Sequence, residues 1–410
     1  MTSFQEKLEK YAALAVEVGV NVQEGQTLVI SAPISAAELV RLIAKKAYEV
    51  GARHVTVDWS DDELTRMRFE KAPEDSFGEF PYWMTKGKNE LAEEGAAFLH
   101  IDSKNPDLLK GIKQERIQEA TKAASQAFKP YRNRMMSDKN SWSIIAMPTK
   151  AWADKVFPDL EESKRMDALW DAIFQATRIN TEDPVQEWKN HTNTLDTKAS
   201  HLNERKYKAL HYTAQGTDLT VELAKDHIWV SAGSENERGA TFIANMPTEE
   251  VFTANAKTGV NGVVTSTKPL SYSGNLIENF TLTFKDGKIV DFKAEKGEET
   301  LRKLIETDEG SAYLGEVALV PHESPISNTN LIFFNTLFDE NASNHFAIGK
   351  AYPFCVEGGK NMNEEQVIAH GLNDSLTHVD FMVGSSDMNI DGITEDGKKE
   401  PIFRNGNWAF

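Results

Sequence analysis

The residues of this chain whose types and spacing could do chemistry are histidines and carboxylates in its second half. His378 and Asp380 lie two positions apart, in a run that continues into the apolar residues 381–383. Side chains two apart on a strand point to the same face of a sheet, so we expect these two side by side. An imidazole beside a carboxylate can bind a metal ion. The alternative is a polar pair that satisfies its own hydrogen bonds.

Two adjacent acids form the second candidate. Glu249 and Glu250 precede the apolar residues Val251 and Phe252. They are typical of the start of a strand or of a helix, where acids interact favourably with the helix dipole. In the functional interpretation one carboxylate binds a metal ion. Its neighbour then takes a proton from the metal-activated water as a general base.

Two further residues lie between these pairs in the sequence. Glu316 stands alone in the apolar run 315–321, which we predict to be a strand, and His345 ends the polar run 339–345, which we predict to be a loop. A buried, unpaired Glu costs several kcal/mol, so a metal ion is a reasonable partner if Glu316 does not face solvent. His345 could equally be an ordinary hydrogen-bonded histidine.

These residues together supply the oxygen and nitrogen ligands of a two-metal hydrolytic site, in which one carboxylate can bridge ions about 3.5–4 Å apart. The set is Glu250, Glu316, His345, His378 and Asp380. Their spacing fits no short metal-binding motif. The chain also contains no glycine-rich nucleotide loop, no nucleophile elbow and no His-Glu-x-x-His helix. The two-metal site is therefore a hypothesis at this stage.

The elements that must position these residues divide the chain in two. In the first half, predicted strands alternate with predicted helices, which is typical of a parallel sheet. The strands are at residues 27–30, 54–58, 97–101 and 142–146, and the helices at 36–50, 89–94 and 116–128. A helical stretch follows at 160–204. We predict an N-terminal parallel-sheet α/β sandwich domain with a helical extension over residues 1–200.

The second half has a different character. We predict strands at residues 219–223, 228–230 and 331–334, a helix at 300–307, and a hairpin whose strands at 280–284 and 289–292 flank Asp286 and Gly287. This pattern indicates a C-terminal mixed α+β domain over residues 201–410, and that domain would carry the metal site.

Composition narrows the class of protein. The 410 residues carry 45 Lys and Arg against 63 Asp and Glu, a net charge of −18. Such a surface repels phosphate backbones and anionic lipid, so we expect no nucleic-acid and no membrane partner. The excess acids serve solubility or, in part, metal binding. The single cysteine, Cys355, excludes an internal disulfide framework. Without an apolar leader or membrane span, we expect a cytoplasmic protein.

Four segments, in this order, resemble motifs of the aminopeptidase T and aminopeptidase S (AmpS, PepS) family of metalloaminopeptidases. They are NMPTEEVF at 245–252, GEVAL at 315–319, NASNH at 341–345 with AIG at 347–349 and AY at 351–352, and THVDFM at 377–382. The resemblance covers the whole chain, from YAxxAV at 11–16 to the carboxyl end. It implies an α/β amino-terminal domain, a carboxyl-terminal domain that holds the active site, and a homodimer.

The resemblance also implies a set of roles. It implies that two divalent ions are bound by Glu250, Glu316, His345, His378 and Asp380, with Glu316 bridging the ions. It also implies that Glu340 is an additional ligand and that Tyr352 is the active-site tyrosine. Zinc, cobalt, manganese and magnesium all suit such ligands. The implied reaction is release of N-terminal amino acids from peptides with a free N-terminus, by water activated at the dinuclear centre.

A mechanism follows as a hypothesis. Glu249 or a neighbouring acid accepts the proton of the water, and Tyr352 donates a hydrogen bond to the developing oxyanion. A metal ion or an acid holds the free α-amine. Two other functions use similar residues: a dinuclear phosphoesterase, although no cationic phosphate clamp flanks these motifs, and a metal-binding, peptide-binding protein without catalysis.

Overall fold

The computed structural model describes residues 3–103, 105, 107–272 and 275–410. The chain forms two compact units: unit 1 is Met1–Asn190 with Gly233–Met246, and unit 2 is His191–Ala232 with Pro247–Phe410. It therefore passes between the units after residues 190, 232 and 246. The domain limits proposed from the sequence, 1–200 and 201–410, place their boundary close to the first of these crossings.

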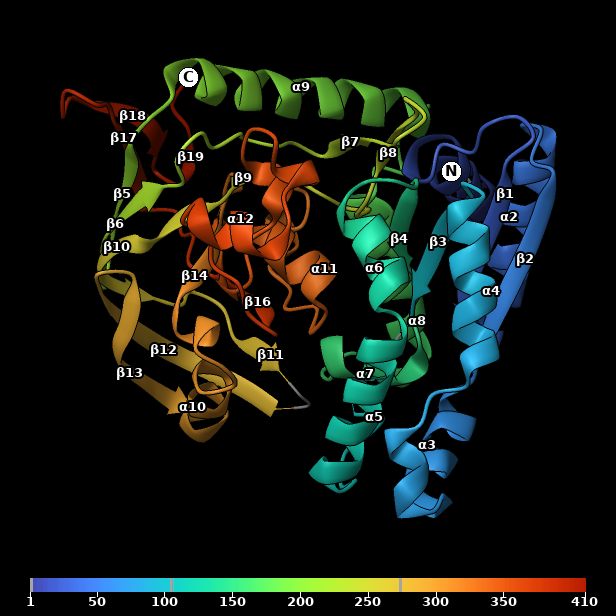
Figure 1. Cartoon of the computed structure of the whole chain (residues 1–410). Coiled ribbons are helices and arrows are strands. Elements are labelled where there is room, and N and C mark those ends of the chain that lie inside the picture. The colour runs from blue at the N-terminus through green and yellow to red at the C-terminus, as the bar shows by residue number, and fades with distance from the viewer. Residues whose placement is uncertain (1–2, 104, 106, 273–274) are drawn as a thin grey trace. The chain divides into compact units, whose positions relative to one another are not determined.

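Unit 1 is built on a parallel sheet of the order β2-β1-β3-β4, which confirms the predicted α/β layer (Figure 1). Its strands are β1 (Thr27–Pro33), β2 (His54–Ser60), β3 (Ala97–Asp102) and β4 (Trp142–Ala146). Its helices are α1 (Phe4–Leu14), α2 (Ala37–Glu49), α3 (Asp62–Lys71), α4 (Tyr82–Glu93), α5 (Gln114–Ala127), α6 (Lys129–Met136), α7 (Lys150–Val156) and α8 (Glu162–Ala176). The small antiparallel pair β7 (Gly233–Glu235) and β8 (Thr241–Ile243) also belongs to this unit.

Helix α2 shows how local sequence builds this unit. Leu39, Val40, Ile43 and Ala47 recur at helical spacing and are all buried, and α2 packs against β1 and β2. The helix stops before Gly51, whose φ of 95° is a conformation that glycine adopts without a steric penalty. The Gly51 carbonyl then accepts the Gly25 amide at 2.8 Å, which fixes the turn before β1.

The larger sheet of unit 2 has the order β11-β12-β10-β6-β5-β17-β18-β19, with β13 paired to β12. These strands are β5 (Ala209–Ala214), β6 (Thr217–Leu223), β10 (Asn255–Thr265), β11 (Leu270–Tyr272), β12 (Asn275–Lys285), β13 (Lys288–Lys296), β17 (Asn389–Ile393), β18 (Lys399–Arg404) and β19 (Asn407–Trp408). Helix α9 (Pro184–Arg205) enters unit 2 at His191, and α10 (Glu298–Ile305) packs against β12 and β13.

The predicted hairpin is confirmed. Lys285 of β12 pairs with Lys288 of β13, and Asp286 and Gly287 between them have φ of 49° and 82°. Positive φ at both positions is the turn that matches strand twist, and it explains the Asp-Gly sequence. A side chain at Gly287 would also meet the Lys257 carbonyl at 1.8 Å.

The smaller sheet of unit 2 is antiparallel and has the order β16-β15-β14-β9. Its strands are β9 (Val251–Thr253), β14 (Leu314–Leu319), β15 (His345–Gly349) and β16 (His378–Met382). All residues of β14 and β15 are buried. The remaining helices are α11 (Thr336–Asp339) and α12 (Glu364–Ala369). No helix in the described part of the chain is both long enough and apolar enough to cross a membrane.

Three local predictions for unit 2 were wrong. Residues 331–334 form a loop, because Phe334 has a φ of 54° and the Asp339 carboxylate accepts the Phe333 amide at 2.8 Å. The segment is apolar because Phe333 stacks on Phe338 in the core. Residues 228–230 form no strand, since only Val230 makes a bridge, to Phe252. His345 lies in a strand instead of a loop.

Candidate metal centre

Four of the five candidate ligands lie on one face of the smaller sheet, and the fifth, Glu250, directly precedes its strand β9. Glu316 of β14 pairs with Ala347 of β15, and Ala347 pairs with Asp380 of β16. Directly opposed residues of antiparallel strands share a face. His345 and His378 lie two positions before Ala347 and Asp380, so they share that face as well. The small Ala347 side chain leaves room between the two carboxylates.

The side chains form two groups that share Glu316. In the first, His345 Nε2 lies 3.1 Å from Glu250 Oε2 and 3.6 Å from Glu316 Oε1. In the second, His378 Nε2 lies 3.7 Å from Glu316 Oε2 and 3.5 Å from Asp380 Oδ1. Within each group the possible ligand atoms lie within 4.8 Å of one another, close enough to hold an ion. Each group could hold one ion, and Glu316 contributes one carboxylate oxygen to each group.

Both histidines are oriented by the main chain. His345 Nδ1 lies 3.1 Å from the Ser343 carbonyl oxygen, and His378 Nδ1 lies 2.7 Å from that of Lys350. A carbonyl oxygen can only accept, so each Nδ1 carries hydrogen and donates it. The lone pair of each neutral ring is then on Nε2, which faces the carboxylates. Metal-binding histidines are usually held in this way.

The charge of the site favours a cation. Burial and the neighbouring carboxylates Asp380 and Glu250 raise the pKa of Glu316 above its ordinary value, although the two histidines oppose this. Burial lowers the pKa of His378, but Asp380 and Glu316 outweigh that effect and raise it to about 9. Buried carboxylates thus outnumber buried imidazoles here. A divalent ion would balance that negative charge.

Glu340 lies close to the centre but belongs to neither group. It follows α11 and is buried, and burial together with the charges of Asp380 and Glu250 raises its pKa well above its ordinary value. Asn341 Nδ2 lies 3.4 Å from its Oε1 atom. The structure therefore places Glu340 in the electrostatic field of the centre, beyond the distances that define the two groups.

Glu249 also lies outside both groups, next to Glu250. Its side chain is buried, with 5% of its surface exposed, and its Oε2 atom is 3.5 Å from Nε2 of His191 in α9. Its amide donates to Asn341 Oδ1 at 2.8 Å. Of the two adjacent acids, the structure thus groups Glu250 with the other candidate ligands and leaves Glu249 beside them.

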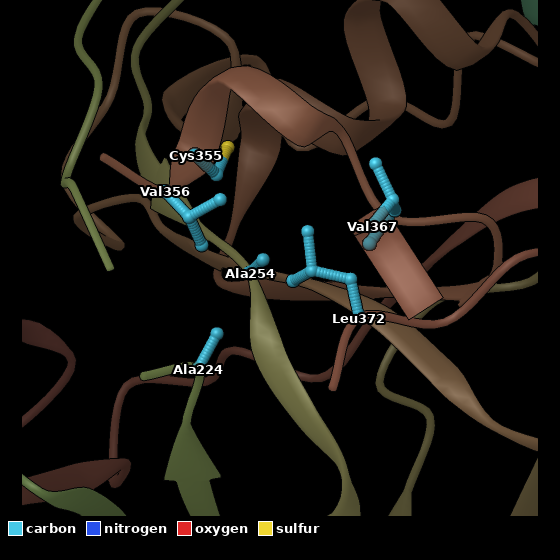
Figure 2. Close-up of a cluster of buried hydrophobic side chains, with 7 residues drawn as sticks. Ala224, Ala254, Cys355, Val356, Val367 and Leu372 are labelled. Carbon is cyan, nitrogen blue, oxygen red and sulfur yellow. The ribbon is translucent and has the colours of Figure 1, made fainter. Parts of the chain in front are cut away.

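Tyr352 lies beside the second group, with its ring centroid 4.6 Å from that of His378. The ring packs with Phe252 and Phe354 against a buried cluster. Figure 2 shows this cluster, which comprises Ala224, Ala254, Ala351, Cys355, Val356, Val367 and Leu372. Burial and the nearby carboxylates raise the pKa of Tyr352 well above its ordinary value. The phenol therefore keeps its proton and can donate a hydrogen bond.

Comparison with known proteins identifies the family. The family model described as thermophilic metalloprotease (M29) matches residues 4–408. The chain is 60% identical to aminopeptidase AmpS of Bacillus subtilis over 410 residues, covering 100% of both, and 44% identical to aminopeptidase T of Thermus aquaticus over 409 residues, again covering 100% of both. The structure of wild-type AmpT from Thermus thermophilus matches with a TM-score of 0.94 at 43% identity, covering 100% of each chain.

The chain belongs to the M29 metalloprotease family. It is a metal-dependent aminopeptidase, a hydrolase of the exopeptidase class. This confirms the resemblance drawn from the four segments. It also favours peptide hydrolysis over the phosphoesterase and the non-catalytic binding protein, the two alternatives left open by the sequence.

Two contributions to the candidate metal centre had no signal in the sequence. The main-chain carbonyls of Ser343 and Lys350 orient His345 and His378. Every residue has such a carbonyl, so the sequence does not indicate which of them contact the histidines. His191 lies 57 positions before Thr248, whose carbonyl it contacts, so spacing gives no hint of it. Asn341, whose Oδ1 accepts the Glu249 amide, lies in the polar run 339–345 and opens the motif NASNH, and these were its signals in the sequence.

Proposed function

We propose that the M29 centre of this chain binds two divalent ions and uses them to hydrolyse the first peptide bond of a substrate with a free N-terminus. The observation that carries the proposal is the position of Glu316, whose two oxygens lie near different histidines. The proposed ligands are Glu250, Glu316, Glu340, His345, His378 and Asp380, and zinc, cobalt, manganese and magnesium all suit this donor set.

The residues beside the ligands have separate roles in this proposal. When bound, the ions supply Lewis-acid polarisation of the scissile carbonyl and lower the pKa of the attacking water. The Glu249 carboxylate accepts the proton of that water, since it lies next to Glu250 but outside both ligand groups. The Tyr352 hydroxyl donates a hydrogen bond to the oxygen on which negative charge develops.

Restriction to the first residue requires a group that recognises the free α-amine of the substrate. A protonated α-amine can form an ion pair with an acid of the site, and a neutral α-amine can bind an ion through its lone pair. The interior of a peptide chain offers no equivalent group. We propose that one of these two contacts holds the N-terminus beside the scissile bond.

The deciding experiment combines activity with metal content. We expect release of p-nitroaniline from Leu-p-nitroanilide after a divalent metal is added, loss of that activity with a chelator, and two ions per subunit by anomalous diffraction. Hydrolysis of phosphate monoesters without peptide hydrolysis would contradict the proposal. A single ion per subunit would contradict its dinuclear form.

A homodimer in the cytoplasm is also proposed. The dimer follows from the family resemblance, and the location follows from the acidic composition with a single cysteine. Sedimentation equilibrium of the purified protein tests the dimer, and fractionation of cells tests the location.

A further inference from the structure

We propose that His191 is a positioning residue that holds the Glu249 carboxylate where it can accept the proton of the attacking water. The inference rests on the general-base role of Glu249 in the proposed function. His191 lies in α9, at the first residue of unit 2, and Glu249 lies just before β9 in the same unit. Nothing in the spacing of the sequence links them.

The contact reaches two atoms of the acid-bearing segment. His191 Nε2 is 2.8 Å from the carbonyl oxygen of Thr248 and 3.5 Å from Glu249 Oε2. Because the carbonyl can only accept, Nε2 carries a hydrogen and donates it. This N–H group therefore lies between the main chain preceding Glu249 and the carboxylate of Glu249 itself. The hydrogen bond limits the backbone path before Glu249, and the ring lying 3.5 Å from Oε2 restricts the space open to the carboxylate of the proposed base.

A second contact holds the same segment, residues 248–250. The Glu249 amide donates to Asn341 Oδ1 at 2.8 Å, and Asn341 Nδ2 donates to the Leu337 carbonyl at 3.1 Å. Asn341 thus fixes the main chain at Glu249, whereas His191 extends to the carboxylate. The His191 and Glu249 side chains are 11% and 5% exposed, so both contacts are sheltered from water. A base held this firmly needs little reorganisation during the reaction.

A purely structural role is the competing explanation, because the hydrogen bond of His191 to Thr248 also connects α9 to the segment before β9. The two roles differ in what a variant changes. A structural contact affects stability and metal content, whereas a positioning contact lowers kcat through Glu249 alone. A double-mutant cycle between the two residues separates these cases.

The experiment uses the metal-loaded enzyme and the substrate Leu-p-nitroanilide. Three single variants are used: His191→Leu, which removes the donor, His191→Gln, whose amide keeps an N–H group at similar reach, and Glu249→Gln. The fourth is the double variant His191→Leu with Glu249→Gln. His201→Leu, elsewhere on α9 where the ring stacks on Phe410, is the matched control. Each protein is measured for kcat, KM, metal content and Tm.

The expected result is specific. His191→Leu lowers kcat by about tenfold, as for loss of a buried hydrogen bond, here the one to the Thr248 carbonyl that aligns Glu249, with KM and metal content unchanged. His191→Gln restores most of the rate, and His201→Leu has no effect on it. In the Glu249→Gln background, His191→Leu causes no further loss of kcat.

Two outcomes overturn the inference in distinguishable ways. If His191→Leu lowers kcat by the same factor in both backgrounds, His191 acts independently of Glu249, and the inference fails while the proposed function stands. If Glu249→Gln alone keeps the wild-type kcat, the general-base role fails and the inference fails with it. Should His191→Leu not fold, His191→Asn, whose amide is too short to reach both atoms, replaces it in the cycle.

Discussion

The protein contains two four-stranded sheets of similar size, and they differ sharply in what they bury. The central strands β1 and β3 of the parallel sheet in unit 1 bury Leu28, Ile30 and Leu99, each at most 1% exposed. The central strands β14 and β15 of the antiparallel sheet in unit 2 bury Glu316 and His345 among apolar neighbours. The centre of the first sheet is a hydrophobic interior, although its strand β3 ends at the buried Asp102, whereas the centre of the second sheet holds charge.

The difference shows what a buried charge requires. In the antiparallel sheet each buried carboxylate has an imidazole nearby, and a divalent ion would complete the balance of charge. In the proposed function this sheet binds metal. Its interior is then less stable without the ion, because binding and activity depend on those same charges.

The largest effect is expected from neutralising the shared carboxylate. Glu316→Gln keeps the shape of the side chain but removes the charge that faces both histidines. We expect kcat to fall at least about a thousandfold, equal to about 4 kcal/mol, and metal content to fall as well. The metal-free variant should unfold at the same temperature as the metal-free wild type or higher, because a buried charge is gone. Wild-type activity in Glu316→Gln would contradict the claim that the antiparallel sheet holds its buried charge for catalysis. The control is Glu299→Gln, which neutralises an exposed acid.

The next effect concerns the tyrosine beside the site. Tyr352→Phe removes the proposed hydrogen bond to the oxyanion and leaves the packing on Phe252 and Phe354 in place. We expect kcat to fall about a hundredfold with little change in KM. Tyr212→Phe, which removes the hydroxyl of a fully buried tyrosine in β5, should leave kcat unchanged. Equal kcat values for the two variants would contradict the role of Tyr352.

A polar residue in the parallel sheet tests the comparison from the other side. Leu99→Asn is similar in size but places an amide among apolar side chains, and Leu99 is 1% exposed. We expect the free energy of unfolding to fall by about 2 kcal/mol, measured with urea. His100→Asn, at the exposed neighbouring position of β3, should change it far less. A tolerated Leu99→Asn would show that the parallel sheet also accepts unpaired polar groups.

The smallest effect concerns the segment that leads into β16. Burial raises the pKa of Asp308, but hydrogen bonds from Leu376, Ser375 and Ser311 outweigh it and hold the pKa below its ordinary value. A lowered pKa adds stability above the unfolded value of about 4, and that stability is lost as the pH falls through the folded pKa. Asp308→Asn should therefore lower Tm at pH 7 more than at pH 3. Glu309→Gln, at the exposed neighbour, should show no such dependence; a constant difference for Asp308→Asn would contradict the argument.

Patterns of short range in the sequence predicted much of this fold. The alternation of β-branched runs with amphipathic helices predicted β1 to β4, and the Asp-Gly pair predicted the turn at residues 286–287. The same period-two reasoning correctly placed His378 and Asp380 on one face of a strand. These features depend on neighbours within a few residues, so they can be predicted from the sequence alone.

The failures involve partners that are distant in the chain or are made of main chain. Residues 331–334 are as apolar as a strand, yet the Asp339 carboxylate holds them in a loop. The convergence of Glu250, Glu316 and His345 depends on strand order, which no local pattern encodes. The family motifs supplied the grouping, and the register of β14, β15 and β16 supplies its physical reason.

The way the chain passes between the units limits how the enzyme can be divided. After the insertion of His191–Ala232 in unit 2, the chain returns to unit 1 at Gly233. There residues 244–246 pair with Ile144 of β4 through main-chain hydrogen bonds of 2.8 and 2.9 Å. A fragment that ends at Asn190 would leave this edge of β4 open, and open strand edges invite aggregation. No single truncation of the chain therefore yields unit 1 intact. A complete unit 1 requires residues 233–246 to be joined to residue 190 through a new linker.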